Sequence, residues 1–316
     1  MHDHRSERSY RRELASFKSV CIVVILSALF PAEQSRAQAG GADTLTSERC
    51  ERCLFWTGGA AVVGMTATYI ALDQAWYAHY ERSPLHGFDD SDEWMQMDKA
   101  GHVYSAYTLG NWGHAAVARC GASPALARWA GGSLGLVFLT GVELLDGTST
   151  GWGFSWSDMA ANVGGTTLFI GQDALWGEQR IQAKFSAHHT DYAAQRPDLL
   201  GTGIVERYLK DYNGQTIWLS ANMDRFAPGV VPQWLNLAVG YGAEGMTSAV
   251  PMEGDAGSGV TSYRQLYLSP DIDLTRIHTR SKCLRTVLFV LNSIKIPAPA
   301  LEFRSNGQVV GHWLYF

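Results

Sequence analysis

The chain has 316 residues, of which 46% are hydrophobic and 17% are charged. This apolar share can build a core for one large domain or two ordinary ones, and it excludes global disorder, since disordered chains are rich in charge and poor in aromatic residues. The formal net charge of -5, from 25 Lys and Arg against 30 Asp and Glu, argues against a nucleic acid partner held by a basic surface.

The first 39 residues have the organisation of an export signal. A basic stretch precedes the apolar run Val20–Phe30, and Ala37-Gln38-Ala39 then supplies the small-x-small pattern that signal peptidase cleaves. An uncleaved membrane anchor is the alternative, but the apolar run is short for a membrane span. We therefore predict an exported chain in the periplasm, or associated with a membrane of the bacterial cell envelope, whose mature N-terminal segment is 40–53.

Four cysteines follow the predicted signal: Cys50, Cys53, Cys120 and Cys283. Cys50 and Cys53 have the spacing of a redox or metal motif, but no second pair completes a zinc site. Because an oxidising compartment permits disulfides, we expect a local disulfide or unpaired thiols here rather than redox catalysis.

Residues 54–200 are predicted to form a helical bundle. Its four apolar segments are 54–72, 100–118, 129–142 and 159–172. Two of them approach the roughly 20 residues that a membrane-spanning helix needs. All are rich in glycine, which costs about 1 kcal/mol relative to alanine in a helix, so close helix packing is expected. Such packing is typical of bundles in lipid, and a soluble bundle with tight crossings is the alternative.

Residues 201–316 form the second predicted region, in which the hydrophobic period changes to two. Strands are expected at 216–223, 234–241, 265–274 (interrupted at Pro270), 301–303 and 309–316, with one further helix over 284–294. The predicted fold class is therefore α+β, with a helical bundle of about four helices followed by a small antiparallel sheet. An aromatic C-terminus is also typical of outer-membrane barrels, but about five strands are fewer than the eight that a single-chain barrel needs.

Charged side chains gather at the ends of the predicted helices. Three consecutive helices each bring a polar pair to one end. The residues concerned are Asp98, Lys99 and His102; Glu143 and Asp146; and Asp158 and Asn162. Because a short connection joins the third and fourth helices, the end of one lies beside the start of the other in an antiparallel hairpin. We therefore predict that these seven side chains form one binding site.

Two chemistries would use this set. His102, Glu143, Asp146 and Asp158 could hold a divalent cation, and their oxygen-rich ligation favours Mn, Mg or Ca over Zn. Alternatively, clustered carboxylates raise one another's pKa, which makes His102, Glu143 and Asp158 candidates for acid–base catalysis. Asn162 would donate a hydrogen bond to a polar head group or orient a ligand.

A structural role without chemistry is also consistent with the pattern. Ser155 and Asp158 fit a helix-capping motif, and an acid in the first turn favours the helix dipole. Membrane-like helices, however, seldom retain several ionisable groups without a use. We therefore predict a cell-envelope protein that binds a divalent cation or an envelope lipid or glycan head group. The alternatives are a hydrolase or transferase acting on an envelope lipid or cell-wall precursor, and a scaffolding protein.

Three motifs carry a resemblance to known families: 97–102, 143–147 and 152–162. Here the chain resembles the YfiM-type family of predicted periplasmic lipoproteins, which implies an envelope location, although no cysteine follows the signal as a lipidation site. The order Asp-Lys, His, Glu, Ser-x-x-Asp and Asn is also similar to that of VanZ-like membrane proteins. That similarity implies membrane helices, without implying a reaction. The expected partner of the protein is a membrane or an envelope lipid.

Overall fold

The computed structural model describes residues 42–78, 80–250 and 261–316, so the predicted export signal lies outside the described residues. The chain forms two compact units. The first combines the described residues up to Phe88 with Gly110–Phe154, and the second combines Asp89–Leu109 with Ser155–Phe316. The expected mixture of helix and sheet is confirmed, with a helical N-terminal half and a six-stranded antiparallel sheet.

The first unit is helical. Its elements are α2 (Ala42–Leu72), the π-helical turn η1 (Asp73–Tyr77), the second half of α3 (Met97–Arg119), α4 (Pro124–Leu126), the π-helical turn η3 (Ala127–Gly131) and α5 (Leu134–Gly147). Tyr69 links α2 to α5, since its hydroxyl donates to the carbonyl of Phe138 at 2.8 Å and the two rings stack at 5.2 Å. The apolar segments predicted as helices thus form helices, with the third divided into short turns before α5.

Close helix approach explains some of the glycines. A Cβ added to Gly113 would lie 2.3 Å from the carbonyl oxygen of Gly131, and one added to Gly165 would lie 2.2 Å from that of Val103. Gly58 and Gly59, by contrast, have nothing within 4 Å of an added Cβ. The predicted packing reason therefore holds in α3, η3 and α6 (Trp156–Trp176) but not at these positions of α2.

Two helical stretches among the described residues are long and apolar enough to cross a membrane. These are Ser47–Leu72, whose most apolar window has no buried residue, and Pro124–Gly147, whose window is 28% buried. A core helix of a soluble protein meets the same criterion of length and composition. Membrane crossing therefore stays a prediction.

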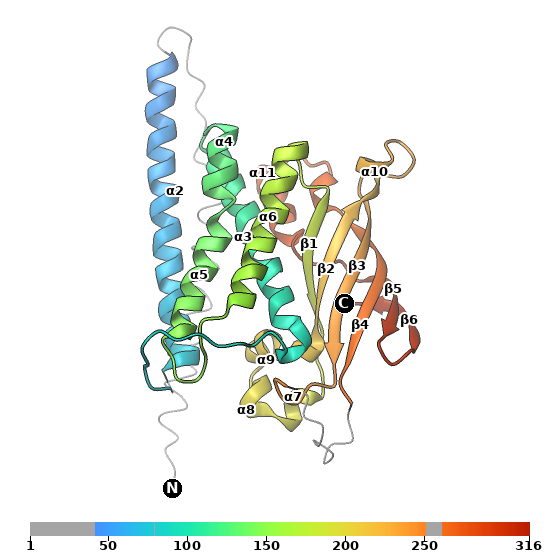
Figure 1. The fold of residues 1–316 in the computed structure, drawn as a ribbon. Coiled ribbons are helices and arrows are strands. Elements are labelled where there is room, and N and C mark those ends of the chain that lie inside the picture. The colour runs from blue at the N-terminus through green and yellow to red at the C-terminus, as the bar shows by residue number, and fades with distance from the viewer. Residues whose placement is uncertain (1–41, 79, 251–260) are drawn as a thin grey trace. The chain divides into compact units, whose positions relative to one another are not determined.

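The second unit is built on the sheet, whose strands follow one another in chain order (Figure 1). They are β1 (Ile181–Ala187), β2 (Gln215–Asn222), β3 (Leu235–Glu244), β4 (Tyr263–Ile272), β5 (Ala298–Arg304) and β6 (Val309–Tyr315). The first half of α3 and α6 pack on β1, where the ring centroids of Tyr104 and Phe185 are 5.7 Å apart. Tyr107, Phe169 and Ala183 belong to the same buried cluster.

Short helices complete the second unit. They are the 3-10 turn η2 (Glu93–Gln96), α7 (Tyr192–Gln195), α8 (Pro197–Leu200), α9 (Ile204–Lys210), η4 (Tyr212–Gly214), α10 (Met223–Phe226), η5 (Leu274–Arg276) and α11 (Lys282–Leu291). The predicted helix after the third strand is confirmed as α11. Arg264 and Tyr241 of the sheet bond the segment before α3, since Arg264 donates to the side chain of Gln96 and Tyr241 to the backbone of Met95.

The inner face of the sheet is polar, although it is buried. Lys184 lies 2.7 Å from the carboxylate of Asp271, and both side chains are fully buried. Beside them, Trp218 and Tyr267 pack against Tyr315, which β6 brings back over β2. The interior of the sheet thus combines buried polar groups with an aromatic cluster.

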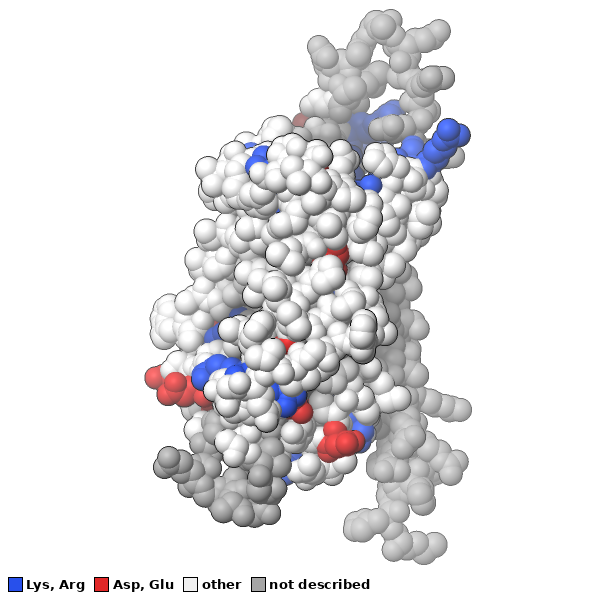
Figure 2. All heavy atoms as spheres, turned by 90° about the vertical axis from the view of Figure 1, so that its right-hand side faces the viewer, with Lys and Arg blue, Asp and Glu red and all other residues white. Residues whose placement is uncertain are grey.

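Figure 2 shows the side of the sheet where β4, β5 and β6 lie, and this side is largely uncharged, with Lys, Arg, Asp and Glu mostly towards its ends.

Two predictions about the strands are wrong. β1 is a strand that the sequence pattern did not predict, in a stretch interpreted as the end of the bundle. Pro270 lies inside β4 instead of interrupting it. Proline is tolerated there because the ladder to β5 ends at Leu268, so the missing N–H faces a side without a strand partner.

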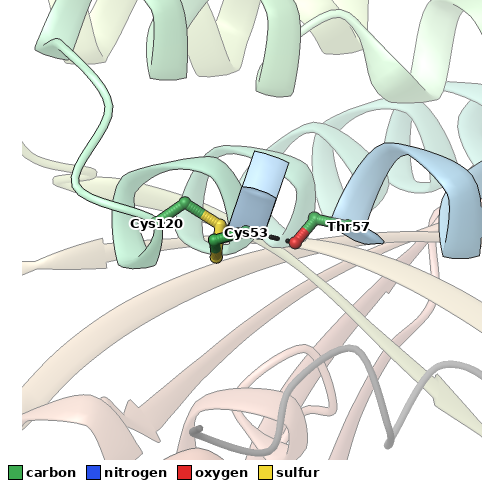
Figure 3. Close-up of a disulfide and its surroundings, with 3 residues drawn as sticks. All are labelled: Cys53, Thr57 and Cys120. Atoms are coloured by element: carbon green, nitrogen blue, oxygen red, sulfur yellow. Dashed lines mark hydrogen bonds between the residues drawn. A yellow bond between two sulfur atoms is a disulfide. The ribbon is translucent and has the colours of Figure 1, made fainter. Parts of the chain in front are cut away.

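The sequence predicts either a local disulfide or unpaired thiols at Cys50 and Cys53, and of these only the unpaired thiol of Cys50 is found. Cys53 is bonded to Cys120, at a Cα–Cα separation of 5.4 Å (Figure 3), whereas Cys50 and Cys283 are free thiols. The helix α2 runs unbroken through Cys50 and Cys53, while Cys120, just after α3, comes within the distance that a disulfide needs. The bond therefore fastens α2 to the end of α3 within the first unit.

Candidate functional site

A cluster of charged side chains lies at the N-terminal ends of α3 and α6. Asp98 and Lys99 are in the first turn of α3, and Asp158 is in the first turn of α6. The cluster is largely buried, since the side chains of Asp98 and Lys99 are 13% and 12% exposed and that of Asp158 is 8% exposed. Acidic groups are favoured at these positions because helix N-termini carry partial positive charge.

The ammonium group of Lys99 is surrounded by three carboxylates. Its Nζ lies 2.8 Å from Asp90 Oδ2, 2.7 Å from Asp98 Oδ2 and 3.2 Å from Asp158 Oδ1. One oxygen from each of these three carboxylates lies within 4.8 Å of the others. The three carboxylates therefore have the spacing of a cation site. The ammonium group of Lys99 already supplies one positive charge to these carboxylates.

Asp90 is held in place from the start of α6. Ser155 is the N-cap of that helix, and its Oγ accepts a hydrogen bond from the backbone N–H of Asp158 at 3.0 Å. The hydroxyls of Ser155 and Ser157 both donate to Asp90 Oδ1, at 2.6 and 2.7 Å. The predicted cap is confirmed, and it also fixes the carboxylate that bonds Lys99.

His102 extends the cluster by one turn of α3. Its Nδ1 lies 2.9 Å from Asn162 Oδ1, and its Nε2 lies 3.9 Å from Asp158 Oδ2. When Asn162 Oδ1 accepts a hydrogen bond from Nδ1–H, the neutral ring keeps its lone pair on Nε2, on the side of Asp158. The Oδ1 atom of Asp158 accepts no hydrogen bond from the described residues, although Lys99 is near it. His102 Nε2 and Asp158 Oδ2 thus face each other at a separation too long for a direct hydrogen bond.

The environment moves the pKa values of these acids apart. Burial raises the pKa of Asp158 to about 6, and neighbouring Asp90 and Asp98 add to this against the opposing charges of His102 and Lys99. Burial alone would also raise the pKa of Asp90, but hydrogen bonds from Lys99, Ser155 and Ser157 outweigh it and lower that pKa. Asp158 therefore changes protonation near neutral pH, and burial also raises the pKa of Asp98.

Glu143 and Asp146 belong to the first unit, near the end of α5. Asp146 Oδ1 accepts a 2.6 Å hydrogen bond from the hydroxyl of Tyr77, and Glu143 is 1% exposed. Burial raises the pKa of the Tyr77 phenol, and the charges of Asp146 and Glu143 raise it further. The first unit thus holds a buried Glu143 and a half-buried Asp146 near Tyr77.

Of the predicted residues, the second unit brings together Asp98, Lys99, His102, Asp158 and Asn162. The sequence pattern missed Asp90 and Ser157. Asp90 lies in a loop before η2, where no hydrophobic period marks a position as buried. Its neighbour Asp89 is an equally acidic but exposed residue, so composition did not separate the two.

Replacing Asp158 by Asn should change the pH dependence of stability. The raised pKa of an acid in the fold means that its stabilising contribution is complete below its ordinary pKa of about 3.9 and is lost as the pH rises through about 6. We therefore expect the free energy of unfolding of Asp158→Asn, relative to the unaltered protein, to rise by about 2–3 kcal/mol between about pH 4 and pH 7.

Urea-induced unfolding across this pH range measures the effect. Asp89→Asn, which alters an exposed carboxylate of the same loop, is the control and should follow the unaltered protein. Parallel pH profiles for Asp158→Asn and the unaltered protein would show that the fold does not raise the pKa of Asp158.

Comparison with family models points to proteins of the bacterial envelope. A model described as "Predicted periplasmic lipoprotein (DUF2279)" matches residues 87–170. The match spans Asp90, the start of α3 and the start of α6, and so includes the whole polar cluster, but it ends before the sheet. It confirms the resemblance to a family of predicted periplasmic lipoproteins and agrees with an exported, envelope-associated location. No curated protein and no solved structure matches the chain.

Proposed function

We propose that this envelope protein binds a divalent cation between His102 and Asp158. The observation that carries the proposal is the arrangement of the His102 ring, whose Nδ1 bonds Asn162 at 2.9 Å while Nε2 faces Asp158 Oδ2 at 3.9 Å. Metal-binding histidines characteristically donate their second ring N–H to a fixed acceptor, which sets the tautomer and orients the ligating nitrogen. Asn162, buried on α6, would be that acceptor.

The charges around the pair favour a cation. Asp90, Asp98 and Asp158 bring three carboxylates, of which Lys99 neutralises one when all are ionised. The hydrogen bonds to Asp90 and Asp98 would orient the carboxylates around the Lys99 ammonium group. Asp158 would ligate the ion through its Oδ2 atom. One imidazole with carboxylate oxygens suits Mn²⁺ best among common envelope cations, with Mg²⁺ and Ca²⁺ favoured less because they prefer oxygen ligands alone.

Calorimetric titration of the purified full chain with MnCl₂ tests the proposal. Binding should be lost in His102→Ala and in Asp158→Asn, and it should survive in the controls His86→Ala and Asp89→Asn, which alter exposed residues of the neighbouring loop. Because protons compete for Asp158, whose pKa is about 6, affinity should fall about tenfold at one pH unit below that value. Equal Mn²⁺ binding by all four variants would overturn the proposal.

A second function uses the same pair as acid and base. The pKa of Asp158, raised to about 6 by burial, suits a general acid that works near neutral pH beside a histidine base. We propose as this alternative a hydrolase or transferase that acts on an envelope lipid or cell-wall precursor. Turnover of envelope lipid extracts that His102→Ala abolishes, without any requirement for a cation, would favour it over cation binding.

A further inference from the structure

The outward-facing side chains of the sheet form two apolar rows that cross the strands. Each row follows the pairing register, in which residues directly opposite one another lie on the same face. The first row is Ala183, Leu219, Val239, Leu268 and Leu301. The second row is Phe185, Ile217, Tyr241, Leu266, Phe303 and Val309. These rows, from here on the outer face, make one continuous apolar surface from β1 to β6.

Two parts of the outer face are covered: the β1 end, and the position of Tyr241 on β3, which packs against the segment before α3. Ala183 is 2% exposed beneath α3 and α6, and Ile217 is 7% exposed. Further along the rows, Val239 and Leu266 are both 52% exposed, and Leu301 is 47% exposed. No described element covers these three side chains. They belong to the same apolar rows as the side chains that form a core beneath α3 and α6.

The inner face has the opposite character. Opposite the apolar rows, the inward positions include Lys184 on β1, Ser220 on β2, Asp271 on β4 and Glu302 on β5, all buried. Ser220 donates to Asp271 at 2.6 Å, and Gln265 donates to Glu302 at 2.8 Å. A water-exposed antiparallel sheet places apolar side chains inside and polar ones outside. A sheet that faces lipid reverses this order, as this sheet does.

The two ends of the outer face differ from its middle. At one end Arg264 is the only charged residue among the outward positions of β2 to β5. At the other end lie Trp234, just before β3, and Trp313 on β6, which are 45% and 93% exposed. Tryptophan concentrates where acyl chains meet lipid head groups. The charges visible in Figure 2 likewise lie mostly towards the ends of this side.

We propose that the outer face of β2 to β5 contacts the acyl chains of a lipid bilayer. The reversed polarity favours lipid, because a sheet that faces acyl chains keeps its polar groups inward and its outward side chains apolar. β3 and β4 each have ten residues, within the 9–11 that a strand needs to match the hydrocarbon core. The proposal does not rest on the cation site, which lies at the ends of α3 and α6.

Nitroxide labels on the full chain in phosphatidylcholine vesicles test this contact. Cys50 and Cys283 are first changed to Ser, which leaves the Cys53–Cys120 disulfide intact. Single cysteines then replace Val239 or Leu301, whose half-exposed side chains leave core packing unaffected by a label. Asn306→Cys, in the exposed turn between β5 and β6, is the matched control.

The measurement compares how strongly two reagents relax the nitroxide by collision. Oxygen concentrates among the acyl chains, whereas a water-soluble nickel chelate stays in water. For labels at positions 239 and 301 we expect strong relaxation by oxygen and little relaxation by the nickel chelate. For the label at position 306 we expect strong relaxation by the nickel chelate and little by oxygen. Nickel access at Val239 and Leu301 equal to that at Asn306 would overturn the proposal. Exclusion of both reagents, with dipolar broadening between labels on different molecules, would also overturn it by showing a second copy on this face.

Discussion

Replacing Asp271 by Ala is expected to lower the free energy of unfolding by about 3–5 kcal/mol. Its carboxylate lies 2.7 Å from Lys184 Nζ and 3.8 Å from Lys295 Nζ, and both lysine side chains are at most 1% exposed. Removing the carboxylate leaves two buried ammonium groups without their counter-ion, and it also leaves the Ser220 hydroxyl without its acceptor. A buried charge without its partner is among the most destabilising changes that a fold can suffer.

Urea-induced unfolding of the purified full chain measures this loss. The matched control is Glu206→Ala, because Glu206 pairs with Lys210 at the same 2.7 Å but is 37% exposed, and such surface pairs contribute at most about 1 kcal/mol. Adding Lys184→Met to Asp271→Ala should recover much of the loss, since it removes one of the two buried charges that have lost their counter-ion. Asp271→Ala and Glu206→Ala with equally small effects would contradict the expectation.

The same ion pair explains why β1 could not be predicted. Its residues alternate, with Ile181, Ala183 and Phe185 on one face and Lys184 on the other. A lysine in such a stretch normally faces water, which makes the segment resemble a polar linker. Lys184 is buried because Asp271, on β4, lies beside it, and no local pattern reveals a partner so far along the chain.

Part of the candidate site could likewise be predicted from the sequence, and part could not. Asp98 and His102 share one face of α3, and Asp158 and Asn162 share one face of α6, so helical spacing alone placed each pair. Asp90 joins them from a loop, through hydrogen bonds with serines of α6. Loops have no hydrophobic period, so a site residue in a loop, such as Asp90, cannot be predicted from the sequence pattern and is found only in the structure.

The cysteines show the same limit most clearly. The sequence pattern left either a local disulfide or unpaired thiols at Cys50 and Cys53, which are neighbours along the chain. The bonded pair, Cys53 and Cys120, is separated by 67 residues, and the arrangement of α2 and α3 within the first unit determines it. Spacing along the chain predicts local structure, whereas pairing across it depends on tertiary contacts.

Replacing Cys120 by Ala is expected to lower the free energy of unfolding by about 4 kcal/mol, which is the chain-entropy contribution of a disulfide that closes a loop of this length. Alanine is preferred to serine because Cys120 is 8% exposed, and a hydroxyl there would add the separate penalty of burying a polar group. The controls are Cys50→Ser and Cys283→Ser, which alter free thiols.

Reduction separates the cross-link from the side-chain change. Dithiothreitol should destabilise the unaltered protein and both control variants in urea-induced unfolding by about the amount lost in Cys120→Ala, because all three carry the bond. It should leave Cys120→Ala unchanged, since that variant has no bond to lose. Destabilisation of Cys120→Ala by the reductant, or indifference of the unaltered protein to it, would show that the link between α2 and the end of α3 does not stabilise the first unit.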